Sequence, residues 1–210
     1  MSPKKKTKKK VTGPIVEVDQ DWETKDKREK GLIRLDVACG CNLAEGFVGV
    51  DISKNTDASI IHDLNSYPWP FEDGSVMEVR VSHYLEHTAD IKRFMEELWR
   101  ITVHAATIVI NAPYYSSIRA WQDYTHVRTI SEATFLYFNR DWMQMNRLEH
   151  YGVNCNFAIQ SVNFLYSGEW KVRANSAQEY ARKHYLNVVD DIVVTLRTIK
   201  EQKVEVPREK

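Results

Sequence analysis

The sequence contains few cysteines and no long apolar run. Only three of its 210 residues are cysteine, and two of these, Cys39 and Cys41, are separated by a single residue. Such an odd, sparse set excludes a disulfide framework and favours a reducing compartment, so a cytoplasmic location is expected. No run reaches the 18 apolar residues of a membrane span, and the first residues lack the apolar centre of a secretory signal.

The formal net charge is zero, but the charges are unevenly divided. Residues 1–10 hold six lysines and no acid, whereas the remaining 200 residues hold 29 Asp and Glu against 23 Lys and Arg. The predicted organisation is a disordered basic tail over 1–13, one domain over 14–200 and a charged tail over 201–210. A short helix is expected over 22–30. The lysines suit nucleic-acid contact, nuclear import or simple solubilisation, and the acidic body leaves them the main source of any nucleic-acid affinity.

Short apolar segments bounded by turn residues run through the body of the chain. Strands are predicted over 32–38, 47–51, 58–62, 77–82, 107–111, 157–165 and 191–197. Apolar side chains at helical spacing predict a helix over 90–101, with Asp90 or Thr88 as its N-cap, and Ser131 is expected to cap a short helix over 132–138. This alternation predicts an α/β sheet. The last two strands, with no strong helical segment between them, predict an antiparallel closing pair.

Polar residues that end strands are the first candidates for a site, because such a sheet binds its ligand at the carboxyl ends of its strands. Gly40 follows the first strand, where the backbone has to turn sharply and glycine has no Cβ in the way. Asp51 ends the second strand, where a carboxylate can accept hydrogen bonds from both hydroxyls of a ribose. After the third strand, Asp63 can accept from an exocyclic amine and Leu64 can lie against an adenine. Their order and spacing indicate one site rather than unrelated turn residues.

Six stretches between Leu32 and Pro113 carry a family resemblance: LDVACG, GFVGVDI, HDL, WPFEDGSVMEVRVSHYLEH, FMEELWRI and IVINAP. In these stretches the chain resembles the class I S-adenosylmethionine-dependent methyltransferases, in the branch that includes ubiquinone-biosynthesis-like enzymes. The resemblance implies a Rossmann-like α/β fold: a mostly parallel seven-stranded sheet with helices on both faces and a C-terminal antiparallel hairpin. It also implies S-adenosylmethionine as cofactor. The implied cofactor-binding residues are Asp36, Ala38, Gly40, Asn42, Asp51, Ile52, Asp63, Leu64, Ser82 and His83.

The loop after the first strand departs from the family pattern. Ala38 and Asn42 stand where the family has glycines, so Gly40 is the one glycine left. Only residues 41–46 separate it from the second strand, too few for a full helix at about 3.6 residues per turn. The helix that normally follows is therefore expected to be missing or reduced to a turn. Asn42 or something from residues 14–30 would then replace the helix N-terminus near the cofactor.

Two other motifs suggest different chemistry. HYLEH at 83–87 matches the inverted zinc-peptidase signature H-x-x-E-H. It directly follows a strand, however, and the next helix is expected only near Asp90, so the two histidines need not share a helix face; no metal site is predicted. NAPY at 111–114 resembles the tetrad of enzymes that methylate amino groups of DNA bases, but it follows the fifth strand instead of the fourth. A nicotinamide dehydrogenase is disfavoured because G-x-G-x-x-G is absent.

The polar and aromatic stretch YYSSIRAWQDYTHVRTIS, residues 114–131, is predicted to contact the substrate. The predicted substrate-binding residues are Asn111, Tyr114, Tyr115, Gln122 and Arg128. His126, with Asp123 as its orienting partner, is the favoured general base, and His83 and His87 are the other candidates.

The sequence therefore predicts methyl transfer from S-adenosylmethionine to an oxygen or nitrogen of an unidentified small-molecule or nucleic-acid acceptor. One alternative is a non-catalytic S-adenosylmethionine-binding module of the same fold, motivated by the lost glycines. Another is a nucleic-acid methyltransferase guided by the lysine tail.

Overall fold

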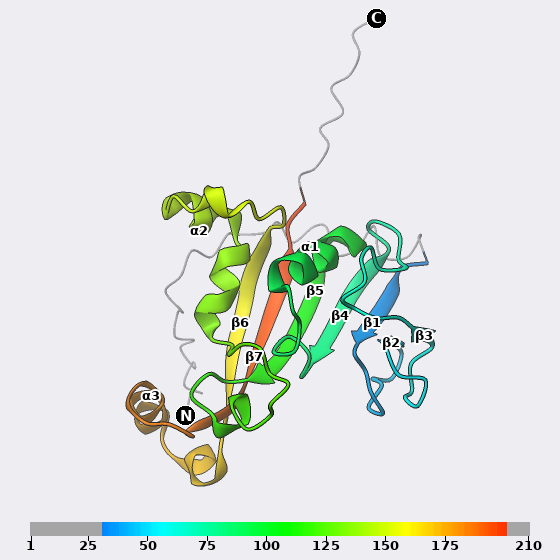
Figure 1. The fold of residues 1–210 in the computed structure, drawn as a ribbon. Coiled ribbons are helices and arrows are strands. Elements are labelled where there is room, and N and C mark those ends of the chain that lie inside the picture. Colours follow the sequence, from blue (N-terminus) through cyan, green and yellow to red (C-terminus); the bar gives the residue numbers. More distant parts are fainter. Residues whose placement is uncertain (1–30, 201–210) are drawn as a thin grey trace, which may run out of the picture.

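The computed structural model describes residues 31–200, which form a seven-stranded mixed sheet (Figure 1). The strands are β1 (Ile33–Val37), β2 (Val48–Asp51), β3 (Ile60–Ile61), β4 (Val76–Ser82), β5 (Thr102–Pro113), β6 (Phe157–Tyr166) and β7 (Val189–Thr198). They lie in the order β3-β2-β1-β4-β5-β7-β6. Neighbours from β3 to β5 are parallel, whereas β7 is antiparallel to both β5 and β6. The predicted parallel sheet with a closing antiparallel pair is confirmed.

Three α-helices and four 3-10 helices accompany the strands in the described residues. They are α1 (Ile91–Ile101), α2 (Arg140–Met145) and α3 (Asn175–His184), with 3-10 helices η2 (Ile118–Ala120), η3 (Glu132–Phe138), η4 (Glu149–Tyr151) and η5 (Gly168–Val172). Asp90 caps α1 as expected, its side chain accepting a hydrogen bond from the Arg93 backbone N–H. The segment expected to be a short helix after Ser131 is the 3-10 helix η3. Helix α3, between β6 and β7, was not predicted.

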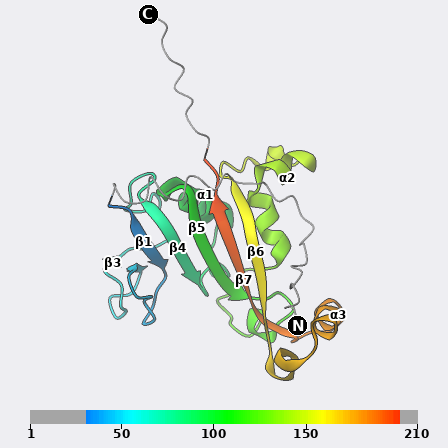
Figure 2. The same ribbon diagram turned by 180° about the vertical axis from the view of Figure 1, so that it is seen from behind.

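The connections beside β2 contain no helix. Residues 38–47 and 52–59 hold only turns and bends, so the expected loss of the helix after β1 is confirmed. Within residues 31–200, α1 and η3 lie over one face of the sheet, and Figure 2 shows the strands of the opposite face with no helix in front of them. This differs from the predicted helices on both faces. The physical reason is length, since connections this short cannot form a helix and return to the sheet.

The buried face of the sheet carries the hydrophobic core. The strand register places Leu35 beside Val79 and Val79 beside Ile108, and all three are fully buried with Phe94 of α1. Residues that alternate with these point to the opposite face, where Asp36 lies beside Arg80. Because α1 is the one helix between two neighbouring parallel strands here, it covers much of the parallel half of the sheet. The candidate site at the strand ends depends on this core for its position.

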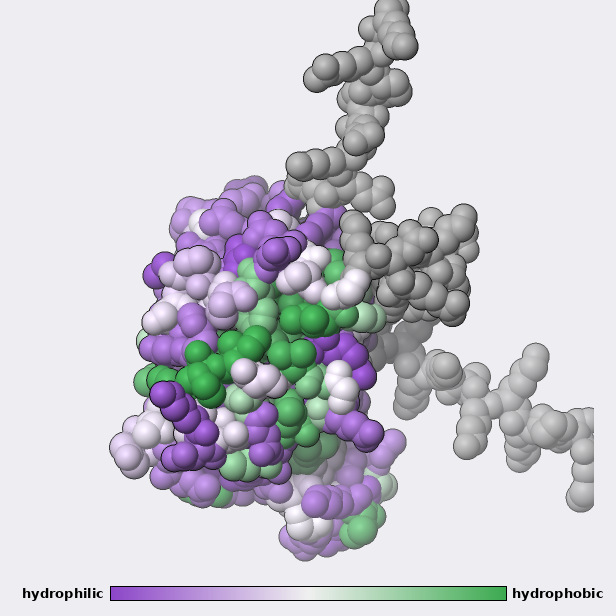
Figure 3. Space-filling view, turned by 90° about the vertical axis from the view of Figure 1, so that its right-hand side faces the viewer, coloured by the Kyte–Doolittle hydropathy of each residue, from purple (hydrophilic) through white to green (hydrophobic). Residues whose placement is uncertain are grey.

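Apolar side chains also gather on the outer edge of the sheet, beside β3. Figure 3 shows this edge as a hydrophobic band surrounded by hydrophilic residues. Ile52 and Ile61, which lie at the ends of β2 and β3, are 66% and 45% exposed. An apolar surface therefore lies directly next to Asp51, the last residue of β2.

Candidate functional site

The loop after β1 folds back onto the end of β2. The Gly40 N–H donates to Oδ2 of Asp51 at 3.0 Å, and the Ser53 N–H donates to Oδ1 at 2.9 Å. A carboxylate has roughly four lone-pair positions, so two remain for a ligand. A Cβ added at Gly40 would meet no atom within 4 Å, so the space beside this loop is open. The Asp51 carboxylate is thus fixed in place while still able to accept two more hydrogen bonds.

Close packing and a left-handed backbone shape the same loop. A Cβ at Gly49 would stand 2.8 Å from Sγ of Cys39 and 3.1 Å from Cα of Ala58, so only glycine lets the loop approach β2 this closely. Ala38 and Gly40 both have a φ of +54°. For Ala38 this region is unfavourable, and side chains held this way are concentrated at functional sites. Ala38, which stands where the resembled family has a glycine, therefore adopts the backbone shape that glycine favours.

Asp36 holds the loop from beneath. The residue is 1% exposed, and Oδ2 accepts from the Ala44 N–H at 2.9 Å and from Nη1 of Arg80 at 3.2 Å. Arg80 also donates to the carbonyl oxygen of Asn42 at 3.2 Å. Asp36 and Asn42, both predicted to bind the cofactor, are thus engaged in shaping the loop, and the Asn42 residue itself is exposed.

We expect Asp36→Ala to destabilise the protein by about 2–3 kcal/mol, because it strands a backbone N–H and removes the partner of Arg80. Urea unfolding measures this loss. Glu45→Ala, at an exposed position of the same loop, is the matched control and should change stability by less than about 0.5 kcal/mol. Equal effects of the two substitutions would contradict the role given to Asp36.

Of the residues expected around an adenine, Ile52 and Asp63 are accessible to a ligand, whereas Leu64 is buried. Ile52 is exposed beside Asp51, as a residue that covers a ligand base should be. Asp63 uses Oδ1 to accept from the Asn65 N–H at 2.9 Å and leaves its other oxygen open. Leu64 is only 3% exposed and belongs to the hydrophobic core. Burial raises the pKa of the neighbouring Tyr84 to about 12, so this phenol stays protonated.

His83 leaves the end of β4 in a strained turn. Its φ is +53°, and its N–H donates to the Asn111 carbonyl at 2.8 Å. Nδ2 of Asn111 lies 3.2 Å from Nε2 of His83, and Ser82 pairs with Asn111 in the sheet. The Glu86 carboxylate, 3.5 Å from Nδ1, raises the pKa of His83 above its usual value, while burial acts in the opposite direction. HYLEH is therefore a turn, as its place after a strand predicted.

Two residues beside His83 did not figure among the sequence candidates. Asp191 of β7 is 5% exposed, with Oδ2 at 2.6 Å from Nη1 of Arg119 and at 3.9 Å from Nε2 of His83. Burial raises the pKa of Asp191, and the Arg119 guanidinium opposes that rise. An antiparallel closing strand begins at the edge where the parallel strands end, and Asp191 pairs with Pro113 there. The sequence signal that could have identified Asp191 was its position at the start of the predicted last strand, residues 191–197.

The predicted substrate residues after β5 lie in different surroundings. Tyr114 is 1% exposed and donates its hydroxyl to Glu132 at 3.0 Å, so it packs in the core. Tyr115 is 43% exposed, and Gln122 is exposed as well. Arg128 is partly buried and donates from Nη2 to the Ala89 carbonyl at 3.0 Å. Tyr115 and Gln122 are therefore the exposed members of this set, and Asn111 is half-buried.

His126, the favoured general base, and Asp123, its predicted orienting partner, are too far apart for a hydrogen bond. Oδ2 of Asp123 stands 3.9 Å from Nε2 of His126, while Oδ1 accepts from the Thr125 hydroxyl at 2.7 Å and the Thr125 N–H at 2.8 Å. These Thr125 bonds are the main cause that lowers the pKa of Asp123. His87, on the loop after β4, stacks edge-on against His126 with ring centroids 4.7 Å apart. Asp123 thus orients Thr125 directly, and the two histidines face each other.

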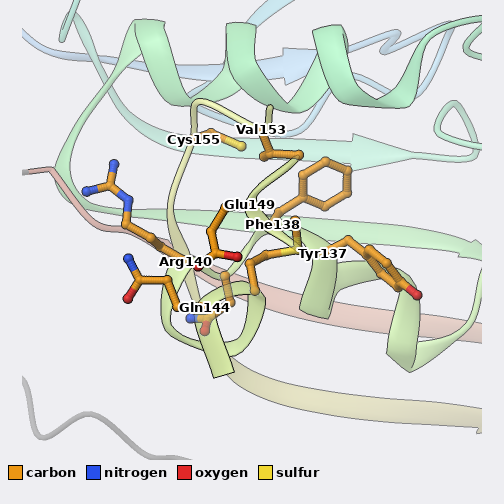
Figure 4. A pocket seen from close by; sticks show the side chains of 9 residues that line it. Tyr137, Phe138, Arg140, Gln144, Glu149, Val153 and Cys155 are labelled. Atoms are coloured by element: carbon orange, nitrogen blue, oxygen red, sulfur yellow. The ribbon is translucent and has the colours of Figure 1, made fainter. Parts of the chain in front are cut away.

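The described residues form several cavities, two of which bear on the site. One, of about 220 Å³, is formed by η3, α2 and the segment before β6 (Figure 4), and α2 lies at the end of the molecule opposite the tips of β1 and β4 (Figure 1). Its lining includes Arg140, Gln144 and Glu149. Another, of about 230 Å³, lies on the uncovered sheet face beside Phe47 and Arg80 and reaches the strand ends, where Ser82 and Asn111 line it. Neither contains Asp51 or His83.

Comparison with solved structures gives the fold. A methyltransferase of Archaeoglobus fulgidus described as dependent on S-adenosylmethionine matches with a TM-score of 0.54 and 20% identity over 80% of this chain and 87% of its own. The complex of the Haloferax volcanii Trm112 methyltransferase activator with a methyltransferase contributes a chain that matches with a TM-score of 0.53, 16% identity and coverage of 83% and 85%. The Streptomyces coelicolor geranyl diphosphate C-methyltransferase, solved with Mg²⁺, geranyl diphosphate and S-adenosylhomocysteine, matches with a TM-score of 0.51, 12% identity and coverage of 81% and 73%.

The chain therefore has the fold of the class I S-adenosylmethionine-dependent methyltransferases, as the resemblance of its sequence implied. No protein-family model and no curated sequence matches it. Between residues 31 and 200, no helix has the length and apolar character needed to cross a membrane.

Proposed function

We propose that this protein transfers a methyl group from S-adenosylmethionine to an oxygen or nitrogen atom of an acceptor. The observation that carries the proposal is Asp51, a carboxylate at the end of β2 that anchors the Gly40 loop and keeps two acceptor positions open. The fold supports it, because its solved examples include methyltransferases, one of them bound to S-adenosylhomocysteine. The cofactor would supply a methyl group activated on a positively charged sulfur.

The residues around Asp51 fit this cofactor. Asp51 would accept from the two ribose hydroxyls, and the open space at Gly40 would let the backbone approach the ligand. Ile52, exposed beside Asp51, would cover one face of the adenine, while Asp63 would accept from its amine. No helix N-terminus follows β1 in residues 31–200, so the carboxylate of the cofactor would need another donor.

The acceptor side lies at the ends of β4 and β5. Asn111 has a buried Oδ1 with no hydrogen-bond partner among the described residues, and its Nδ2 is next to Nε2 of His83. An unsatisfied amide oxygen at a strand end is well suited to a donor group of a ligand. We therefore place the acceptor against His83 and Asn111, with Tyr115 and Gln122 at the rim. The main contribution of these residues would be alignment of the acceptor atom with the methyl carbon and exclusion of water.

Two measurements test the proposal. Isothermal titration with S-adenosylmethionine should show one binding site on the full chain, and absence of binding would refute the cofactor assignment. A screen with radiolabelled methyl donor against nucleic acids, sugars and small phenols should then label an acceptor. Binding without any labelled acceptor would favour the non-catalytic module instead. Removing residues 1–10 tests the nucleic-acid alternative, which requires weaker binding with a flatter salt dependence.

Cysteine labelling gives a further prediction. Cys41 is exposed in the loop next to Gly40, whereas burial raises the pKa of Cys39 to about 11 and of Cys155 to about 12. In the part of the chain that the structure describes, iodoacetamide at pH 8 should therefore modify Cys41 first. Saturating S-adenosylhomocysteine should slow this reaction at least threefold, because the bound nucleoside would cover the loop. An unchanged rate in a protein shown to bind the ligand would contradict this placement.

A further inference from the structure

Three side chains from two separate loops meet beside the strand ends. Glu86 and His87 come from the turn after β4, and His126 comes from the loop after β5. One ligand atom from each of them lies within 4.8 Å of the others. The Val127 N–H donates to the Glu86 carbonyl oxygen at 3.0 Å and holds the two loops together. The juxtaposition is thus fixed by the backbone.

The burial of Glu86 without a hydrogen bond indicates that this cluster binds a cation. Its residue is 2% exposed, and neither carboxylate oxygen has a hydrogen-bond partner. Nδ1 of His83 lies 3.5 Å from Oε1 and forms a long ion pair with it when the ring is protonated. A buried carboxylate whose nearest donor stays at this distance is costly, and native structures normally satisfy such groups with a close hydrogen bond or an ion. A metal cation bound to Glu86 would remove that cost.

The hydrogen bonds of the two histidines fix which ring nitrogen is free. Nδ1 of His126 lies 3.1 Å from the Ala120 carbonyl oxygen, which can only accept, so Nδ1 carries the proton. Nδ1 of His87 lies 3.0 Å from the Thr125 hydroxyl, whose own proton goes to Asp123 at 2.7 Å, so this Nδ1 donates as well. Both rings therefore present an unprotonated Nε2. Metal-binding histidines are typically held in this way, by a hydrogen bond from the second ring nitrogen.

We propose that Glu86, His87 and His126 bind one divalent transition-metal ion of the Zn²⁺ type. Two imidazoles and one carboxylate suit such an ion better than Mg²⁺, which prefers oxygen ligands. Ligand atoms about 2.1 Å from a zinc ion are separated by at most about 4.2 Å, so the cluster has to contract slightly. The Glu86 carboxylate, which no hydrogen bond restrains, can supply this movement. Three protein ligands leave at least one coordination position for water or another ligand.

The geometry differs from the peptidase reading of HYLEH. The metal would use the adjacent pair Glu86 and His87 with the distant His126, and His83 would not be a ligand. The site adjoins the proposed acceptor region through His83 and does not depend on the cofactor for its assembly.

Metal titration of the full chain, first stripped with a chelator, tests the site. One equivalent of Zn²⁺ should bind by isothermal titration, and Co²⁺ should give a visible absorption band that Zn²⁺ abolishes. Glu86→Gln and His126→Ala should each weaken Zn²⁺ binding at least tenfold. His184→Ala, at an exposed position of α3, is the matched control and should leave the affinity unchanged. Thermal melts keep the test decisive, because Zn²⁺ should raise the Tm of the wild type and of His184→Ala only.

Several outcomes would overturn the proposal: no stoichiometric Zn²⁺ binding, binding that survives both substitutions, or binding of Mg²⁺ in preference to Zn²⁺. S-adenosylmethionine titration of the same chelator-treated sample separates this result from the proposed function. Cofactor binding without Zn²⁺ binding would refute the metal site alone, and the reverse would refute the cofactor alone.

Discussion

Replacement of Asp51 by Ala should weaken S-adenosylmethionine binding about 100-fold or more. The carboxylate would accept hydrogen bonds from two ribose hydroxyls, and a hydrogen bond to a charged group contributes about 1.5–3 kcal/mol. Loss of about 3 kcal/mol corresponds to roughly a hundredfold change in Kd. The substitution also releases the Gly40 N–H and the Ser53 N–H, which loosens the loop that the ligand has to contact. Isothermal titration of both proteins measures the difference.

Two further variants make this result specific to the ribose contact. Asp51→Asn keeps an oxygen that can accept from Gly40 but loses the charge, so its affinity should fall between those of wild type and Asp51→Ala. Asp57→Ala, at an exposed position in the following turn, should bind normally. Thermal melts without ligand exclude unfolding as the cause. Equal affinity of Asp51→Ala and wild type would remove Asp51 from the site and leave the proposed function without its main support.

The sequence predicted the part of the fold that depends on short-range patterns. Alternating apolar residues located all seven strands, and the six residues after Cys39–Gly40 were too few for a helix, which the structure confirms. Helix α3 was missed because its residues are almost entirely polar; Ala181 is its one buried residue, so no apolar periodicity marks it. β5 begins at Thr102 rather than at the predicted Thr107, because residues 103–106 continue the strand with Ala105 in a left-handed conformation. Local propensity could not show either feature.

The same limit applies to which candidate site residues the sequence could bring together. Gly40 follows β1 and Asp51 ends β2, and these two strands are adjacent and parallel, so their meeting follows from sheet topology, with which the 3.0 Å bond between them agrees. Glu86 and His126 lie on loops 40 positions apart, where no periodic rule relates them. Their meeting depends on the Val127 hydrogen bond to Glu86, a contact that only the folded chain reveals. Leu64 was predicted to lie against an adenine, but it is buried in the core. Sequence alone could not decide this, because an apolar residue after a strand can face either the ligand or the core.

Phe94→Ala should produce the largest loss of stability, about 3–5 kcal/mol. Phe94 is fully buried on α1, with its ring 5.3 Å from Trp69 and 5.6 Å from Tyr84 between centroids. Truncation of a buried Phe removes its transfer free energy and leaves a cavity. Because α1 is the crossover helix between β4 and β5, and no second helix packs beside it over β1 and β2 in residues 31–200, neighbouring elements have little capacity to fill that cavity. A domain stability of roughly 5–15 kcal/mol makes this a large fraction of the total.

Chemical and thermal unfolding measure the effect, with an expected fall in Tm of about 10 °C for a chain of this size. Lys92→Ala is the matched control on the same helix, since its ammonium makes a long, partly exposed 3.9 Å pair with Glu96, and its effect should stay below about 0.5 kcal/mol. Phe94→Leu, which fills most of the space, should cost about 1–1.5 kcal/mol and keeps the test informative if Phe94→Ala does not fold. A loss below 1 kcal/mol for Phe94→Ala would mean that other elements cover this face of the sheet.

Because His83 and Glu86 lie next to Tyr84 in the turn that packs on Phe94, a genuine cavity should also lower S-adenosylmethionine and Zn²⁺ affinity together.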